Sequence, residues 1–219
     1  MSLFSRLRNR KGERPEAAAP EAPEMPLAAD ETFEPDEVTF TAHSRYERDF
    51  DFTGFWHDTA ESERRHRCPP PTPETVLAVE DELGYKLPSS YIELMRLHNG
   101  GLVNRCRYRV PAPAEGCPDT IYITEILGIS TEVPYSLCGR FGSSFLIDSR
   151  KHKKDIGVAI CNTTLPGRAL VFLDYRACGR TGEPCVTWAD AVEGTEIHLA
   201  HDFAEFVRGL EANTVSPQA

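Results

Sequence analysis

The stretch that decides the fold runs from residue 83 to residue 101 and reads LGYKLPSSYIELMRLHNGG. Ser90 and Glu93 have the spacing of a capping box, which predicts a helix beginning there. The apolar face of this helix is set by residues three and four apart, namely Tyr91, Leu94, Met95 and His98. Asn99-Gly100-Gly101 then ends the helix, because glycine readily adopts the left-handed backbone of a helix stop.

A second helix is predicted immediately before this stretch. Thr72 is placed as its N-cap and Pro73 as its first residue, where the missing N–H of proline costs nothing. Its buried stripe follows helical spacing and consists of Val76, Val79 and Leu83. Gly84 is placed to close it in a left-handed conformation. The chain therefore contains a pair of short helices joined by a tight turn.

Beyond Gly101 the pattern becomes that of strands. Five short segments are rich in β-branched and aromatic residues and are separated by turn formers: 102–110, 120–129, 156–161, 169–175 and 184–189. A last helix is predicted over 197–210, with a stripe of Ala200, Phe203, Val207 and Leu210. These elements predict an α+β fold, in which helices pack on a mostly antiparallel sheet.

The two ends of the chain differ from its body. Residues 15–37 hold five prolines, six alanines and eight acidic residues, with no basic residue. Such a composition buries too little apolar surface to offset the entropy of ordering. We therefore expect a disordered tail over 1–37, with a basic start and an acidic Pro/Ala-rich tether. A folded domain is expected over 38–212, and a short C-terminal tail over 213–219.

Composition limits the kinds of partner. The formal net charge is -10, which argues against nucleic acid because phosphate contacts need a clustered positive surface. The seven cysteines include no C-x-x-C pair, so free thiols in a reducing compartment are expected and a zinc site is not. No window approaches the roughly 20 apolar residues of a membrane-spanning helix. The start lacks the apolar core of a secretory signal. We therefore expect a cytoplasmic protein that needs no cofactor or metal.

Several strings, in a fixed order, resemble the SUKH superfamily. The first is the LG..LP..Y pattern from Leu83 to Tyr91 with the following Asn-Gly-Gly turn, and the later ones are Ile126–Ile129, Pro166–Cys185 and Ala200–Phe206. The resemblance covers roughly residues 56–211. It implies helices packed on an antiparallel sheet. It also implies a protein-binding role, since many members are immunity proteins that neutralise bacterial toxins and fungal members are linked to cell-wall assembly and signalling.

The resemblance and the acidic charge together predict a non-enzymatic immunity-type protein that binds a toxin or effector domain with a basic surface. The candidate partner-binding residues are Trp56, Asp174, Glu183 and Asp190. Asp174 could equally satisfy loop N–H groups at a strand end. A scaffold or signalling adaptor of the same superfamily is the alternative function. Oligomeric state does not follow from the sequence.

A thiol-dependent hydrolase is the remaining alternative. It would need a thiol from Cys161, Cys178 or Cys185 and a base from His198 or His201, yet no nucleophile motif surrounds any of these residues. No catalytic residue is therefore assigned. The basic run 150–154 is expected to be a solvated turn between strands.

Overall fold

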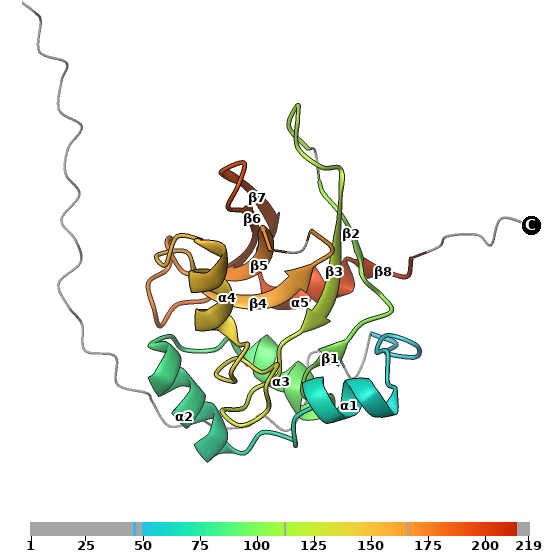
Figure 1. Cartoon of the computed structure of the whole chain (residues 1–219), viewed down its shortest axis with the longest axis vertical. Coiled ribbons are helices and arrows are strands. Elements are labelled where there is room, and N and C mark those ends of the chain that lie inside the picture. The colour runs from blue at the N-terminus through green and yellow to red at the C-terminus, as the bar shows by residue number, and fades with distance from the viewer. Residues whose placement is uncertain (1–45, 47–49, 112, 166, 214–219) are drawn as a thin grey trace, which may run out of the picture. The chain divides into compact units, whose positions relative to one another are not determined.

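The computed structural model describes residues 46, 50–111, 113–165 and 167–213 (Figure 1). The expected tail 1–37 and nearly all of the expected tail 213–219 lie outside these residues. The helices are α1 (Ala60–His66), α2 (Pro73–Leu83), α3 (Ser89–Leu97), α4 (Ser143–Arg150) and α5 (Phe203–Arg208). The strands are β1 (Gly101–Leu102), β2 (Arg107–Arg109), β3 (Thr120–Ile126), β4 (Gly157–Thr163), β5 (Ala169–Asp174), β6 (Cys185–Asp190), β7 (Thr195–Ala200) and β8 (Leu210–Glu211).

The strands form one sheet in the order β7-β6-β5-β4-β3-β2-β8, and β1 also pairs with β3. All of these pairings are antiparallel. Every residue of β5 is buried, which marks the centre of the core. Helix α4 packs on β4, and α5 packs on β6, β7 and α3. The predicted α+β class with a mostly antiparallel sheet is therefore confirmed. Within the described part of the chain, no helix has the length and apolarity needed to cross a membrane.

Helix α2 begins and ends as the sequence predicts. The Thr72 side chain accepts a hydrogen bond from the Thr75 backbone N–H at 3.2 Å, and Gly84 ends the helix with φ of 71°. The predicted capping box on Ser90 is wrong: Pro88 is the N-cap of α3 and caps it without a side-chain hydrogen bond, while Ser90 lies within the first turn and is fully buried. Ser90 cannot cap the helix because it is the second helical residue, two positions after the N-cap.

Residues 197–210 are not one helix. Their first part belongs to β7, which pairs with β6 through a tight turn in which Gly194 has φ of 68°. The more and less exposed residues of β7 alternate with a period of two along most of its length, which suits a strand. Asp202 then starts α5 by accepting a hydrogen bond from the Glu205 N–H at 2.7 Å. The helix therefore begins later than predicted because a strong cap fixes its start.

Three further expectations are corrected. The segment 102–110 is divided between β1 and β2. Helices α1 and α4 were not predicted. The basic run 150–154 begins as the end of α4 and leads into β4, so it lies between a helix and a strand, and its His152 is 8% exposed.

A buried asparagine joins the end of α3 to the connection 127–142. The Asn99 side chain accepts from the Ile129 N–H at 2.7 Å, and it donates to the carbonyls of Ile129 at 3.0 Å and Pro69 at 2.5 Å. The backbones also approach closely, because a Cβ added to Gly100 would lie 2.5 Å from the Gly128 nitrogen. The Asn-Gly-Gly sequence therefore ends a helix and also holds a long connection against it.

Replacing Asn99 with Ala should lower the free energy of unfolding by about 2 to 4 kcal/mol, because the two buried backbone groups of Ile129 and the part-buried Pro69 carbonyl would lose their partner. The matched control is Asn104→Ala, since the exposed Asn104 amide also makes two side-chain hydrogen bonds. The Asn104→Ala substitution should lower the free energy of unfolding by under about 1 kcal/mol, because water replaces the lost hydrogen bonds. Urea unfolding measures both. Equal losses in the two variants would contradict the role given to Asn99.

Candidate protein-binding face

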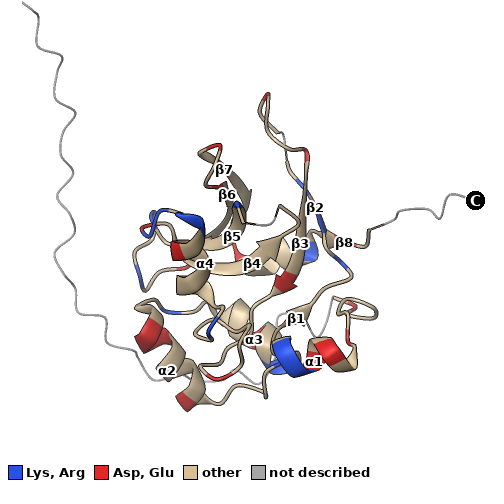
Figure 2. Ribbon diagram, in the orientation of Figure 1, with Lys and Arg blue, Asp and Glu red and all other residues tan. Residues whose placement is uncertain are grey.

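Helix α2 presents an acidic face to solvent. Val76 and Val79 are buried on its inner side, whereas Glu74, Asp81 and Glu82 are exposed. The helix contains no Lys or Arg, and Figure 2 shows acidic but no basic residues along it. Three carboxylates without a basic neighbour on the same helix produce a region of negative potential.

A hollow of about 360 Å³ adjoins this face. Its walls come from the segment before α2, from α2 itself and from the connection 127–142, through Pro69, Pro70, Glu74, Thr75, Ala78, Ile129, Ser130, Thr131 and Glu132. Glu132 is exposed and adds a fourth carboxylate. A hydrogen bond from Thr72 holds the pKa of Glu74 below its ordinary value, so this carboxylate stays ionised to a lower pH than a free glutamate. We call Glu74, Asp81, Glu82 and Glu132, with the hollow, the acidic face.

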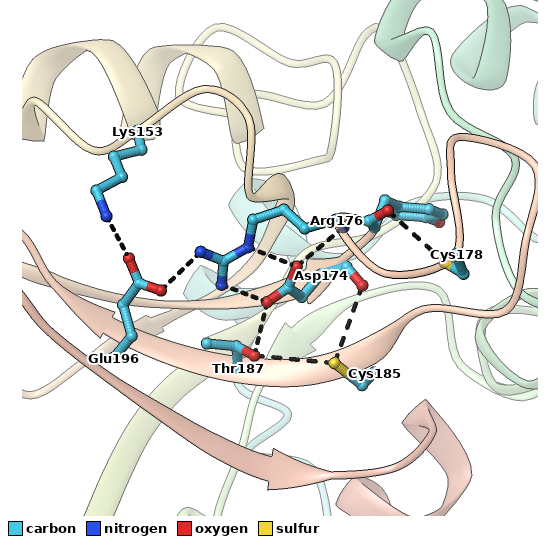
Figure 3. Close-up of polar contacts among 8 residues, drawn as sticks. Lys153, Asp174, Arg176, Cys178, Cys185, Thr187 and Glu196 are labelled. Carbon is cyan, nitrogen blue, oxygen red and sulfur yellow. Dashed lines mark hydrogen bonds and ion pairs between the residues drawn. The ribbon is translucent and has the colours of Figure 1, made fainter. Parts of the chain in front are cut away.

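Asp174 lies at the end of β5, within a network of ion pairs (Figure 3). Its carboxylate accepts from Nε and Nη2 of Arg176 at 2.9 and 2.6 Å, and from the Thr187 hydroxyl at 3.0 Å. Arg176 also donates to Glu196 at 2.7 Å, and Lys153 donates to the same carboxylate at 2.9 Å. Two acids and two bases thus cancel, so this network contributes little to the negative potential.

The ionisation of Asp174 depends on these contacts. Asp174 is only 7% exposed, and burial by itself raises the pKa of a carboxyl group. The hydrogen bonds from Arg176 and Thr187 outweigh burial, so the pKa of Asp174 lies below its ordinary value. The sequence-based alternative, that Asp174 satisfies a loop N–H, is confirmed by the bond from the Arg176 backbone at 3.1 Å.

The loop 175–184 connects this network to the turn after α2. The Tyr175 hydroxyl donates to the Lys86 carbonyl at 2.5 Å, and the Lys86 N–H donates to the Arg180 carbonyl at 2.8 Å. The rings of Tyr85 and Tyr175 lie 4.7 Å apart. Glu183 is exposed on the same loop. Glu183 therefore lies on a loop that hydrogen bonds hold against the turn at the end of α2.

The other two candidates lie elsewhere. Asp190 is 3% exposed and accepts from Arg168 Nε at 2.8 Å, and hydrogen bonds from Arg168 hold its pKa below the ordinary value against the effect of burial. Trp56 is half-buried and stacks on His98 with ring centroids 4.1 Å apart. A partner-binding role for Trp56, Asp174, Glu183 and Asp190 stays a prediction.

The surroundings of the cysteines do not favour a nucleophilic thiolate. All seven cysteines lie in the described part of the chain and are free thiols. Burial raises the pKa of Cys161 well above its ordinary value, and it also raises the pKa of Cys178 and Cys185. A raised pKa disfavours the reactive thiolate. His198 lies on β7 and His201 beyond its end, so the two do not share a helix as predicted. Within the described residues, no group of three His, Cys, Asp or Glu side chains could hold a metal ion.

The model of the SMI1 / KNR4 family (SUKH-1) matches residues 70–209, which is well over half of the chain, and the chain belongs to this family. The match spans α2 through α5 and includes the acidic face. The family is generally one of non-enzymatic immunity proteins and regulators. No curated protein matches the chain.

The acidic face was missed by the reasoning from sequence, although its signal is present there. Glu74 and Asp81 are seven residues apart and fall on the side of α2 opposite to Val76 and Val79, and Glu82 lies beside them. Helical spacing does not reveal the contribution of Glu132, which reaches the same face only through the connection 127–142.

The Asp174 network predicts a pH-dependent stability. Because folding lowers the pKa of Asp174, the stabilisation is complete above the unfolded value of about 3.9 and is lost as pH falls through the lower folded value. Asp174→Asn should therefore be about 1 to 3 kcal/mol less stable than the wild type at pH 7, and this gap should narrow on acidification below about pH 4.

Urea unfolding at a series of pH values measures the gap. Asp119→Asn serves as the matched control, because Asp119 is exposed on a loop and its substitution should have little effect at any pH. A stability gap between the wild type and Asp174→Asn that does not change with pH would contradict this account.

Proposed function

We propose that this protein is an immunity-type inhibitor that binds a toxin domain with a basic surface through the acidic face. The observation that carries this proposal is the outer side of α2, where Glu74, Asp81 and Glu82 are exposed and no basic residue of the helix offsets them. Membership of the SUKH-1 family supports a protein-interaction or immunity-like role.

Inhibition would come from occlusion without a cofactor. A toxin that acts on a polyanion needs a basic groove, and an acidic helix laid against such a groove opposes its charge and blocks entry of substrate. The same charges accelerate association by electrostatic steering, which weakens as salt rises. The hollow beside α2 would accept a side chain of the partner. Toxin and inhibitor would meet in the cytoplasm.

The four residues predicted from sequence take different parts in this proposal. Glu183 would contact the partner at the edge of the acidic face. Asp174 would act indirectly, since it holds Arg176 at the start of the loop that carries Glu183. Asp190 and Trp56 would support the fold, because one is buried in an ion pair and the other is stacked on His98.

A scaffold or adaptor of the same superfamily is the second candidate. It is supported by an exposed surface of opposite character, built on Tyr135, Phe141 and two arginines. An adaptor would use this second surface to hold a second partner.

Reversing the acidic face should abolish inhibition. The partner is first identified by co-purification with the full-length protein and mass spectrometry, and its toxin domain is then expressed in cells with each variant. Asp81→Lys with Glu82→Lys should lose protection from the toxin and slow association about tenfold or more, since like charges would meet. Glu115→Lys with Asp155→Lys is the matched control, because it changes the net charge equally at exposed positions elsewhere.

Protection should survive in the control and disappear in the α2 variant. Equal protection by both variants would refute the acidic face as the inhibitory surface. A partner without toxicity, bound together with other unrelated proteins, would favour the adaptor.

A further inference from the structure

A row of aromatic rings and arginines is formed by the connection between β3 and α4 together with one residue of α1 and one of α4. The ring centroids of Tyr135 and Phe141 are 5.1 Å apart, and those of Phe141 and Phe145 are 5.4 Å apart. The guanidinium of Arg65 lies 5.1 Å from the Tyr135 centroid, and that of Arg140 lies 5.3 Å from the Phe141 centroid. We call these five residues the arginine–aromatic row.

The row is open to solvent. Phe145 is 47% exposed, and it is the one aromatic residue among the exposed large hydrophobic residues of the described chain. The side chain of Arg65 is 51% exposed, Arg140 is exposed, and the two remaining rings are half-buried. Phe145 packs edge-on against Phe141 and so extends a line of contacting rings. Contiguous apolar patches of this kind mark interaction sites, whereas single scattered apolar residues do not.

The row is also held in place. The Leu137 N–H donates to the Gly128 carbonyl at 2.8 Å, and the Phe141 N–H donates to the Pro134 carbonyl at 2.8 Å, which folds the connection back on itself. Connections longer than about 12 to 15 residues without regular structure are usually functional when they are ordered.

A contact between His66 and Glu125 supports the first ring of the row. Tyr135 stacks on His66 with centroids 4.4 Å apart and an interplanar angle of 23°. His66 Nδ1 lies 2.5 Å from a carboxylate oxygen of Glu125, which is 4% exposed on β3. The row is thus built on the sheet through His66, and a surface fixed before binding loses less entropy when it binds.

The chemistry of the row selects its partner. A guanidinium over an aromatic face keeps its N–H edges available for a carboxylate, which it can hold with two hydrogen bonds. Arg140 makes no ion pair with any residue that the structure describes, so its N–H groups are available. Arg65 donates a hydrogen bond to the Tyr135 hydroxyl at 2.9 Å and lies 3.8 Å from a carboxylate oxygen of the exposed Glu61, so part of its donor capacity is already used. Tyrosine and arginine are the residues most enriched in binding hot spots, together with tryptophan.

We propose that the arginine–aromatic row is a docking surface for an extended acidic segment of a partner protein. The carboxylates of this acidic segment pair with Arg65 and Arg140, and the apolar side chains of the segment pack on Tyr135, Phe141 and Phe145. This proposal goes beyond the inhibitory function and does not depend on it, because the row and the acidic face have opposite charge and select different ligands.

The test uses the full-length protein and a fluorescein-labelled peptide of repeated Glu-Leu-Pro units, with binding followed by fluorescence anisotropy. The peptide should bind, and its affinity should fall as salt rises. Phe145→Ser and Arg140→Glu should each weaken binding about tenfold, the effect of losing one hot-spot residue. Leu165→Ser and Arg180→Glu are the matched controls, because Leu165 is an exposed apolar residue outside the row and the exposed Arg180 lies over the Tyr85 ring as Arg140 lies over Phe141.

The controls should bind the acidic peptide as the wild type does, and all four variants should keep the wild-type unfolding temperature. The proposal is overturned if the acidic peptide does not bind, if a Lys-Leu-Pro peptide binds equally well, or if the controls lose as much affinity as the row variants. Preferential binding of an oligothymidylate would also overturn it, since the ligand would then be a nucleic acid. The α2 double variant should still bind the peptide, which separates this result from the inhibitory function.

Discussion

The hydrogen bonds of the buried Asn99 amide are the constraint on which the two exposed surfaces depend. They tie the end of α3 to Ile129 and Pro69, and the adjacent Gly100 backbone crosses Gly128 at a distance that leaves no room for a side chain. The Tyr91 hydroxyl adds a hydrogen bond to the Leu127 carbonyl. The connection 127–142 is therefore fixed at its start by α3. One part of it then lines the hollow beside α2, and the next part carries Tyr135 and Phe141.

The negative charge of the protein is not distributed evenly over its carboxylates. Asp174 and Asp190 are buried and bound by arginines, which satisfies their oxygens and cancels their field. Glu74, Asp81 and Glu82 are exposed on a helix without basic residues. The net charge of -10 does not by itself locate an acidic surface. Carboxylates that are paired inside the protein contribute nothing to such a surface, so only the exposed and unpaired ones indicate where a partner could bind. Burial, rather than residue type, decides which acids a partner can meet.

The sequence predicts most strongly those elements whose signal is local. Thr72, Pro73 and Gly84 bound α2 correctly because a cap and a left-handed stop act within one turn. Ser90 had the spacing of a cap, but packing placed it in the core. The prediction for 197–210 was wrong because its apolar residues fit a helix, whereas pairing with β6 selected a strand for the first part. Pairing between distant segments cannot be read from periodicity alone.

The candidate site also contains parts that have a local sequence signal and parts that do not. The outer face of α2 follows from helical spacing, but the hollow, the Glu125–His66 support and the aromatic row each join segments far apart in sequence. In the proposed complex the partner covers α2. Hydrogen–deuterium exchange of the protein with and without its captured partner tests this most directly. Slower exchange in residues 73–84 and 129–132 is the predicted footprint, whereas protection confined to β6 and β7, with α2 unchanged, would contradict the account.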